Sequence, residues 1–274
     1  MSREIRIQEV VIGGKSPVAL IAGPCVIEGR EETLRIAEKL QEIASGIPLP
    51  LIFKSSYDKA NRSSLTSFRG PGLKRGLDIL REVRERLSLP VLSDVHRFEE
   101  IKEAASVLDI IQIPAFLCRQ TDFVLDVART GKPVNVKKGQ FIAPQEVKNI
   151  IEKITSTGNE KILITERGFT FGYNNLVADM RSLVILKQFG YPVVFDATHS
   201  VQLPGGLLSS SGGEREFTPP LSRAAAAVGI DALFLEVHES PERALCDGPN
   251  SLTLKELPAL LRTIREIDHI VKEA

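Results

Sequence analysis

The sequence predicts an α/β protein with the architecture of a (β/α)8 barrel. Eight short, apolar, β-branched runs recur along the 274 residues, and a helical pattern follows each of them. The runs lack the apolar/polar alternation of a strand with one wet face, so we expect parallel strands buried on both sides. The predicted strands are Val18–Ala22, Leu51–Lys54, Val91–Asp94, Ile110–Ile113, Val134–Lys137, Ile162–Thr165, Val193–Asp196 and Ala232–Glu236.

The helices are predicted from apolar residues spaced three or four positions apart. In the first helix, Leu34, Ala37 and Leu40 fall on one face. Two later helices begin with Pro144 and Pro219, and proline is favoured in the first helical turn. The predicted helices are Glu31–Ala44, Leu73–Leu87, Phe98–Val107, Asp122–Ala128, Pro144–Ile154, Leu176–Gln188, Pro219–Val228 and Leu257–Val271.

The N-terminal segment precedes the alternating strands and helices. Ile5–Val11 alternates weakly and ends at two glycines, which predicts a short β-hairpin that caps the barrel within residues 1–17. No linker or break in composition follows, so we expect residues 1–274 to form one barrel domain. A doubly wound open sheet is the competing fold. It usually carries a glycine-rich dinucleotide turn after its first strand, and Gly23-Pro24-Cys25 is not that turn.

Composition excludes several classes of function. Lys plus Arg and Asp plus Glu each number 35, so the neutral chain offers no global attraction for nucleic acid or an anionic membrane. No run reaches the roughly 20 apolar residues of a membrane helix, and the charged N-terminus does not resemble a signal peptide. Three cysteines do not indicate a disulfide framework, and Cys118 and Cys246 are assigned to packing. We therefore expect a soluble, cytoplasmic protein.

Charged side chains are concentrated at and just past the predicted strand ends. In a barrel these positions face one mouth, where ligands bind. Such a mouth would hold phosphate or carboxylate groups through charge-assisted hydrogen bonds. The cationic residues of this set are Lys54, Lys59, Arg62, Lys137, Lys138 and Arg167.

A thiol, an imidazole and two carboxylates also follow strand ends. Cys25 comes after the first strand and His199 after the seventh, while Glu236 and Asp247 belong to the eighth unit. Each alone has an ordinary structural explanation, but the first, seventh and eighth strands are neighbours once a barrel closes. Together these residues predict a site for a divalent transition metal, which could be Zn, Fe, Mn, Co or Cd.

Eight longer motifs cover almost the whole chain in one order. They are Ala22–Cys25, Phe53–Ser56, Lys59–Ser64, Gln112–Leu117, Asn135–Gln140, Thr165–Gly168, Asp196–Ser200 and Gln202–Gly206. On these motifs the sequence resembles the 3-deoxy-D-manno-octulosonate 8-phosphate synthases. The resemblance implies a homotetrameric (β/α)8 barrel that condenses phosphoenolpyruvate with D-arabinose 5-phosphate and water. The product would feed lipopolysaccharide biosynthesis.

The resemblance implies roles for individual residues. Lys137 and Arg167, with the backbone of Ala115, would bind the phosphate of phosphoenolpyruvate, and Lys54 and Gln112 would lie near its carboxylate or bridging region. The residues implied for the sugar phosphate are Lys59, Asn61, Arg62 and Ser63, together with Arg119 from a neighbouring subunit.

The same resemblance concerns the metal and the catalytic residues. Cys25 places the chain with the metal-dependent members, because the metal-independent ones carry asparagine there. His199, Glu236 and Asp247 match the other ligands, although Cys246-Asp247-Gly248-Pro249 is a form associated more with the metal-independent group. The candidate catalytic residues are His199, Asp94, Lys59 and Asp247.

The glycine- and serine-rich loop from Pro204 to Gly213 is expected to close over the mouth when substrates bind, with Gln202 and Arg215 as anchors. Two other functions are weighed against the main one. The sister 3-deoxy-D-arabino-heptulosonate 7-phosphate synthases use erythrose 4-phosphate, but their sugar motif is Lys-Pro-Arg-Thr where this chain has Lys59–Ser63. The other hypothesis is a barrel that binds sugar phosphates as a sensor and catalyses no reaction.

Overall fold

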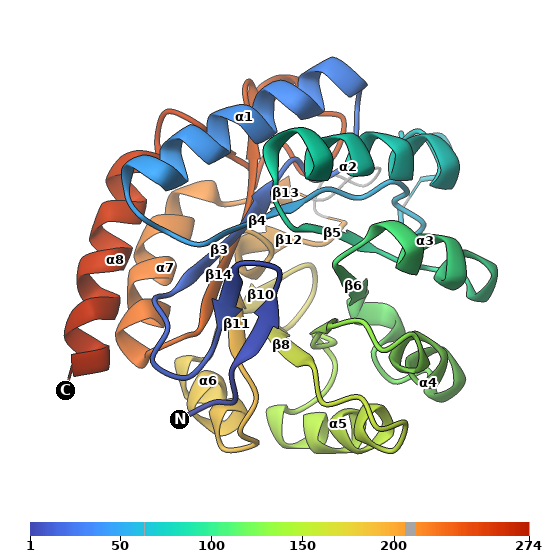
Figure 1. The fold of residues 1–274 in the computed structure, drawn as a ribbon. Coiled ribbons are helices and arrows are strands. Elements are labelled where there is room, and N and C mark those ends of the chain that lie inside the picture. Colours follow the sequence, from blue (N-terminus) through green and yellow to red (C-terminus); the bar gives the residue numbers. More distant parts are fainter. Residues whose placement is uncertain (63, 206–211, 274) are drawn as a thin grey trace.

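The computed structural model describes residues 1–62, 64–205 and 212–273, and it confirms the predicted barrel. Eight parallel strands hydrogen-bond in chain order, and β14 pairs with both β11 and β3, which closes the sheet. Figure 1 shows the helices arranged around this sheet. The barrel strands are β3 (Ala19–Gly23), β4 (Leu51–Lys54), β5 (Val91–Asp94), β6 (Ile110–Ile113), β7 (Val134–Lys137), β8 (Ile162–Glu166), β11 (Val193–Asp196) and β14 (Ala232–His238).

The outer layer is helical. Pro144 opens a short 3₁₀ turn before α5, and Pro219 lies in the first turn of α7, as their fixed φ angles favour. A similar 3₁₀ turn, Phe98–Glu100, precedes α3. The helices are α1 (Arg30–Gly46), α2 (Leu73–Leu87), α3 (Ile101–Val107), α4 (Thr121–Arg129), α5 (Val147–Thr155), α6 (Met180–Lys187), α7 (Thr218–Val228) and α8 (Leu257–Glu273).

The predicted N-terminal hairpin is also confirmed. β1 (Ile5–Ile7) and β2 (Val10–Ile12) pair antiparallel, and Figure 1 shows them in front of the barrel strands. Ile5, Ile7 and Ile12 are buried in one apolar cluster with side chains of the barrel strands, such as Ile21 and Phe234. The hairpin therefore closes the amino-terminal end of the barrel and leaves the carboxyl end for a ligand.

One predicted helix begins later than expected. Leu176–Val177 forms the short strand β10, which pairs with β9 (Phe169–Thr170), and α6 starts only at Met180. The turn between the two strands holds Asn174 at a positive φ of 52°, a conformation that asparagine tolerates. The side chain of Asp179 then caps α6 by accepting a hydrogen bond from the backbone N–H of Arg181 at 3.0 Å. The prediction placed the start of the helix too early because it followed the spacing of apolar residues and not the turn at Asn174 or the cap at Asp179.

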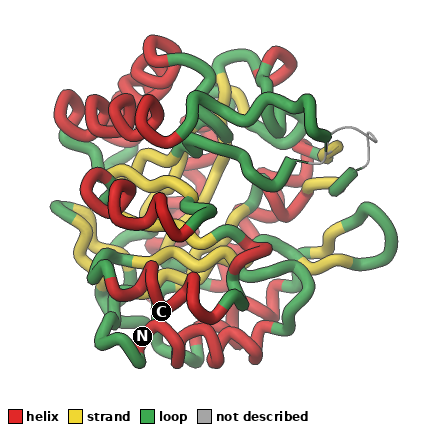
Figure 2. Tube along the Cα trace, turned by 90° about the vertical axis from the view of Figure 1, so that its right-hand side faces the viewer, coloured by secondary structure: helices red, strands yellow, loops and turns green. Residues whose placement is uncertain are grey.

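Three shorter strands complete the described chain. β12 (Gln202–Leu203) and β13 (Gly212–Gly213) pair antiparallel, and β15 (Leu252–Thr253) extends the sheet beside β14. Figure 2 shows β12 and β13 near one end of the molecule, next to the residues drawn in grey. Within the described ranges, no helix has the length and apolar character needed to cross a membrane.

Gly23, at the end of β3, permits a close approach between two strands. A Cβ atom at this position would overlap the backbone oxygen of Lys54 on β4. We predict that Gly23→Ala destabilises the protein by about 1–3 kcal/mol, because the neighbouring strand must shift to admit the methyl group. Denaturant unfolding followed by circular dichroism measures this loss.

The control is Gly46→Ala, because a Cβ atom there has no neighbour within 4 Å and the residue ends α1. This variant should unfold at the wild-type denaturant concentration or slightly above it. Equal stabilities of the two variants would contradict the proposed strand contact.

Candidate active site and metal centre

A polar pocket opens at the carboxyl ends of the barrel strands. Its walls come from the ends of β4 to β7 and from the loops that follow β4, β5, β6, β8 and β11. Most of its side chains are cations, carboxylates or amides, which matches the chemistry predicted for the strand ends. The lining residues are Lys54, Lys59, Asn61, Asp94, His96, Gln112, Pro114, Ala115, Lys137, Arg167 and His199.

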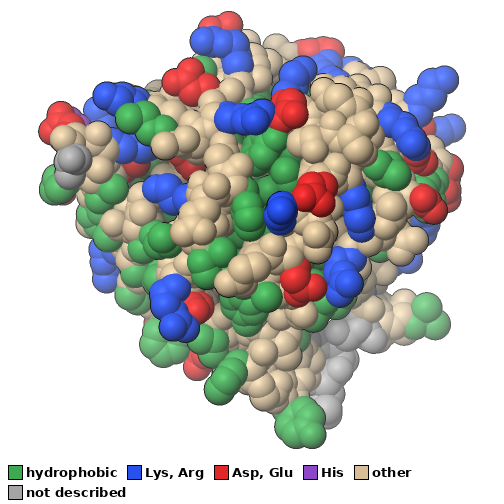
Figure 3. All heavy atoms as spheres, turned by 90° about the horizontal axis from the view of Figure 1, so that it is seen from below, with side chains coloured by type: hydrophobic (Ala, Val, Ile, Leu, Met, Phe, Trp, Pro, Cys, Tyr) green, Lys and Arg blue, Asp and Glu red, His purple; other side chains and the backbone are tan. Residues whose placement is uncertain are grey.

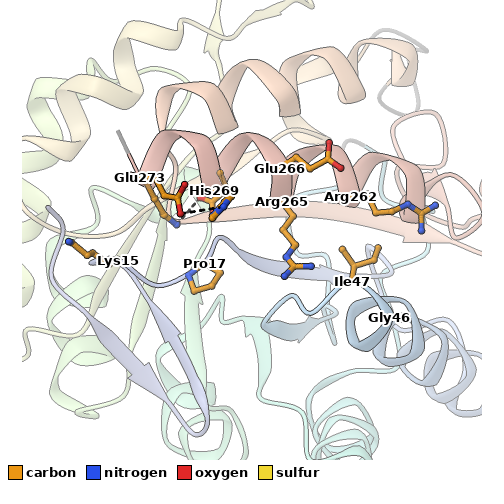
Figure 4. A pocket seen from close by; sticks show the side chains of 11 residues that line it. Lys15, Pro17, Gly46, Ile47, Arg262, Arg265, Glu266, His269 and Glu273 are labelled. Atoms are coloured by element: carbon orange, nitrogen blue, oxygen red, sulfur yellow. Dashed lines mark ion pairs between the residues drawn. The ribbon is translucent and has the colours of Figure 1, made fainter.

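A larger hollow lies elsewhere, along α8, the end of α1 and the segment before β3 (Figure 4). Lys15 and Pro17 precede β3, and Gly46 and Ile47 precede β4, so the hollow belongs to the amino-terminal side of the barrel. Two of its basic side chains already have carboxylate partners, since Lys272 lies 2.7 Å from Asp268 and His269 lies 3.3 Å from Glu273. Active sites in this architecture are built at the opposite end. The strand-end pocket is therefore the candidate active site.

Two groups of metal-ligand side chains lie close together and share Asp247. In one group, Nε2 of His199 is 3.6 Å from an oxygen of Glu236 and 3.6 Å from an oxygen of Asp247. In the other, Sγ of Cys25 is 3.3 Å from Asp247 and 3.0 Å from Sγ of Cys246. The fold thus gathers all four predicted ligands, with a second thiol beside them.

Two features of this cluster fit a metal ion. Oε2 of Glu236 is buried and lacks a hydrogen-bond partner within the described part of the chain, a costly state that a cation would relieve. Nδ1 of His199 lies 2.6 Å from the buried carboxylate of Asp196, which orients the ring and leaves Nε2 on the side of the other ligands. A thiol, an imidazole and two carboxylates are a donor set for a divalent transition ion.

The surroundings of Cys25 and His199 favour the protonated form of each of these two candidate ligands. Burial raises the pKa of the Cys25 thiol, and the neighbouring Cys246 raises it further. Burial opposes a charge on His199, but Asp196 and Glu236 outweigh it and raise the pKa of the imidazole. Metal binding at this cluster would therefore displace protons from sulfur and nitrogen.

Buried cations face the pocket beside carboxylate partners. Lys54 donates hydrogen bonds to Glu236 at 2.8 Å and to the backbone oxygen of Cys25 at 3.0 Å, and Lys137 forms an ion pair with Asp196. Burial lowers the pKa of Lys137, because desolvation outweighs the attraction of Asp196. A bound anion would stabilise these charges, so the pocket is poised for anionic groups.

Asp94 is held as a carboxylate in the pocket wall. It accepts hydrogen bonds from Ser56 at 2.5 Å and from the side-chain amide of Gln112. Burial alone would raise the pKa of this carboxyl, but the charges of Lys54 and Lys59 hold the pKa well below its usual range. Near neutral pH, Asp94 is therefore ionised, so it can stabilise a nearby positive charge but has no proton to donate.

Lys138 does not belong to the pocket, contrary to its place in the predicted cationic set. Its side chain is fully buried, with Nζ 3.4 Å from a carboxylate oxygen of Glu166 and 3.6 Å from the ring centroid of Phe169. Lys137 and Lys138 are adjacent, and neighbouring side chains at a strand end point to opposite faces of the sheet. Only Lys137 can therefore point to the mouth.

The residues implied for the sugar phosphate are divided in space. Lys59 and Asn61 line the pocket, whereas Arg62 donates a hydrogen bond to Sγ of Cys246 at 2.8 Å. Ser63 lies outside the described residues. Arg119 stands away from the pocket, with 63% of its side chain exposed.

The two predicted loop anchors have different partners. Gln202 accepts a hydrogen bond from Arg167 at 3.0 Å and donates one to Asp247 at 3.3 Å, so it joins a pocket cation to a candidate metal ligand. Arg215 donates to the backbone oxygen of Ser251 at 3.2 Å and does not line the pocket. Residues 206–211 of the predicted lid lie outside the described residues.

Three site residues were missed from the sequence. Asp196 stands three positions before His199, a spacing that a strand-end turn can close, and its charge within an apolar strand was a usable signal. His96 follows Asp94 by two residues and lines the pocket. Cys246 was assigned to packing, and only the fold places it beside Cys25.

Comparison with known proteins agrees with this architecture. The chain is 64% identical to the 2-dehydro-3-deoxyphosphooctonate aldolases of Geobacter sulfurreducens and Geobacter metallireducens, and 62% identical to that of Pelobacter propionicus. Each match spans 272 residues, which is 99% of this chain and 100% of the relative. Residues 3–273 match the DAHP synthetase I family. The chain therefore belongs to the DAHP synthetase I family.

Proposed function

We propose that the protein condenses phosphoenolpyruvate with D-arabinose 5-phosphate and water to give 3-deoxy-D-manno-octulosonate 8-phosphate and phosphate, a step of lipopolysaccharide biosynthesis. The observation that carries this proposal is the 62–64% identity, over essentially whole chains, to proteins named 2-dehydro-3-deoxyphosphooctonate aldolase. That name specifies an eight-carbon product, so it favours the five-carbon sugar over the erythrose 4-phosphate alternative. The cationic pocket supports two phosphorylated substrates.

The phosphoenolpyruvate subsite would lie on the side of β6 to β8. Lys137 and Arg167 would bind its phosphate with the backbone of Ala115, while Lys54 and Gln112 would lie near its carboxylate or bridging region. All five residues line one pocket, which supports the assignment. Dense positive charge is needed because two anionic substrates repel each other as they approach.

The sugar phosphate would be held by Lys59, Asn61, Arg62 and Ser63. Lys59 and Asn61 support this subsite from the pocket wall, where Asn61 offers an amide to a sugar hydroxyl. Arg62 lies near by at Cys246. Arg119, which is exposed outside the pocket, suits a residue that serves the site of a neighbouring subunit.

Bond formation would begin with attack of C3 of phosphoenolpyruvate on the sugar aldehyde. Positive charge then develops at C2, where water adds before phosphate leaves with cleavage of the C–O bond. The fixed negative charge of Asp94 in the pocket wall can stabilise that developing charge. His199 and Lys59, which also line the pocket, are the other groups able to hold or pass a proton near the reacting atoms. Burial alone would raise the pKa of Asp247, but His199 and Lys59 hold it well below its usual range, so Asp247 would act as an ionised carboxylate.

Cys25, His199, Glu236 and Asp247 would hold a divalent transition metal. Such an ion supplies Lewis acidity towards a water molecule or the aldehyde oxygen. The surrounding residues orient the ligands, because Asp196 fixes the imidazole of His199 and Lys54 holds one oxygen of Glu236. Gln202 performs the same task for Asp247.

We also infer a homotetramer of single-domain subunits in the cytoplasm. The exposed apolar side chains around α6 and the β9–β10 hairpin support an assembly: Phe171 is 70% and Val184 is 51% exposed. Figure 3 views the side where α5 and α6 lie and shows hydrophobic side chains gathered between charged ones. Apolar patches of this kind commonly mark contacts between protein chains.

A phosphate-release assay tests the function. Phosphoenolpyruvate with arabinose 5-phosphate should release phosphate, and replacing the sugar by erythrose 4-phosphate should reduce kcat/KM by orders of magnitude, because pocket donors made for one more hydroxyl are left unpaired. Preference for erythrose 4-phosphate would establish the sister activity. Tight binding of both substrates without phosphate release would establish a sensor.

Arg167→Ala should weaken the use of phosphoenolpyruvate. The change removes a buried charged donor, which costs roughly 2–3 kcal/mol, or about 30- to 150-fold in kcat/KM for this substrate. Steady-state kinetics measure the loss. The control is Arg129→Ala, which removes an exposed arginine whose ion-pair partner in the described chain is Asp126 of the same helix. An unchanged constant for phosphoenolpyruvate in Arg167→Ala would contradict the phosphate assignment.

Metal affinity should rise steeply with pH. The raised pKa values of Cys25 and His199 favour their protonated forms, and each group must lose a proton to bind a metal. The apparent affinity for Co or Cd should therefore fall by up to about a hundredfold for each pH unit of acidification. Titration calorimetry in buffers of different ionisation enthalpy counts the released protons.

Variants of Cys25 test the same metal site. Cys25→Ala should release one proton fewer than the wild type and bind metal more weakly. Cys25→Asn places here the residue of the metal-independent relatives and should keep some turnover after chelation. Full activity of the wild-type protein after verified removal of all metal would refute a catalytic metal and leave the synthase assignment intact.

A further inference from the structure

Five polar side chains form a row along neighbouring strands of the barrel wall. They come from consecutive strands or strand ends, β4 to β8, and each is buried, with at most 6% of its surface exposed. Asp94 lies opposite Gln112 in the register of β5 and β6, and Gln112 lies opposite Asn135 in that of β6 and β7. The members of the row are Ser56, Asp94, Gln112, Asn135 and Thr165.

Hydrogen bonds join the row from end to end. The hydroxyl of Thr165 donates to Oδ1 of Asn135 at 2.6 Å, and Nδ2 of Asn135 donates to Oε1 of Gln112 at 2.7 Å. Nε2 of Gln112 donates to Asp94, which also accepts from the hydroxyl of Ser56 at 2.5 Å. Every donor in the row therefore points towards Asp94.

The ionised carboxylate dictates this direction. A carboxylate only accepts hydrogen bonds, so Gln112 must present its NH₂ group to Asp94 and its oxygen to Asn135. Asn135 must then present its own NH₂ group to Gln112 and its oxygen to Thr165. Each amide has one satisfied orientation, and a reversal at any position would set two acceptors against each other in a buried site.

Only two members of the row reach the pocket. Gln112 and Asp94 line it, whereas Asn135 and Thr165 lie behind them. Within the described residues, Nε2 of Gln112 donates to Asp94 alone, so its second hydrogen is left for a ligand. The row thus guarantees that Gln112 offers an anionic ligand a donor rather than an acceptor.

We infer that Asn135 and Thr165 are positioning residues for the reaction, because from behind the pocket wall they hold the Gln112 amide in the orientation that Asp94 requires, and this amide receives the anionic substrate. The inference rests on the proposed function, in which Gln112 lies near the carboxylate or bridging region of phosphoenolpyruvate. It goes beyond that function by assigning roles to two residues that cannot touch the substrate from behind the pocket wall.

Asn135→Asp is the central test. Near neutral pH and above, the new carboxylate faces Oε1 of Gln112, so either Gln112 reverses or the carboxylate must take a proton. When protonated, the new group donates to Gln112 and accepts from Thr165, which restores the direction of the row. The other charged or titratable groups of the row and the adjoining pocket wall are Asp94, Lys54, Lys59, His96, Lys137, Arg167 and His199.

The variant should therefore regain activity as the pH falls. At about pH 9 we expect roughly a hundredfold loss of kcat/KM for phosphoenolpyruvate, the cost of a misplaced contact group. The ratio of variant to wild type should rise at least about tenfold between about pH 9 and about pH 6, where a carboxyl with a raised pKa gains its proton. A constant ratio across this range would overturn the inference.

Thermal unfolding gives a second readout that does not depend on activity. The carboxyl introduced by Asn135→Asp has a raised pKa in the folded protein, so its deprotonation on the alkaline side destabilises the fold. The difference in Tm from the wild type should shrink as the pH falls. A Tm difference that is independent of pH would show that the row has no fixed direction.

Matched variants separate positioning from general damage. Thr165→Val should raise KM for phosphoenolpyruvate several-fold, and Thr165→Ser, which keeps the hydroxyl, should restore it. Ser93→Ala is the control, because Ser93 is a fully buried residue of β5 whose hydroxyl has no hydrogen-bond partner in the described chain. Equal losses in Ser93→Ala and Thr165→Val would overturn the inference.

The proposed function and this inference fail in different ways. A wild-type protein that releases no phosphate from phosphoenolpyruvate and arabinose 5-phosphate refutes the function, and the catalytic role of the row is refuted with it. An active wild type whose Asn135→Asp variant keeps a constant activity ratio refutes the inference alone.

Discussion

The closure of the barrel by β14 is the constraint on which the rest of the site depends. Because β14 pairs with β3 on one side and β11 on the other, the ends of the first, seventh and eighth barrel strands become neighbours. Cys25 and His199 follow β3 and β11, Glu236 lies near the end of β14, and the three residues are far apart in the sequence. Without the pairing of β14 with β11, His199 would lie at one edge of an open sheet, and Cys25 and Glu236 would lie near the opposite edge.

Closure also buries charged side chains at the carboxyl end of the barrel, where they form ion pairs. Lys54 pairs with Glu236 and Lys137 pairs with Asp196, all at almost fully buried positions. Such pairs are expensive to desolvate and contribute little stability by themselves. Their value lies in arrangement, because each pair keeps a cation ready for an anionic ligand while its carboxylate orients or supplies a metal ligand.

Much of the fold could be predicted from the sequence, because strands buried on both faces leave continuous apolar runs and helices leave a three-to-four residue repeat. The residues at the ends of those runs are then placed at one mouth by topology alone, which is why Lys54, Gln112 and Arg167 were found. The start of α6 was misplaced, since the apolar spacing there conceals a two-strand turn. Lys138 was misplaced because a one-residue step along a strand reverses the side chain.

The sequence by itself determined the barrel, its hairpin cap and the chemical character of the mouth, because these follow from local periodicity and from which residues end each strand. The tertiary structure alone decided which of those residues meet. Cys246 lies beside Cys25, Asp196 orients His199, and a row of donors runs from Thr165 to Asp94. Contacts across strands depend on register, curvature and side-chain direction, and the periodicity of a single segment does not determine any of these.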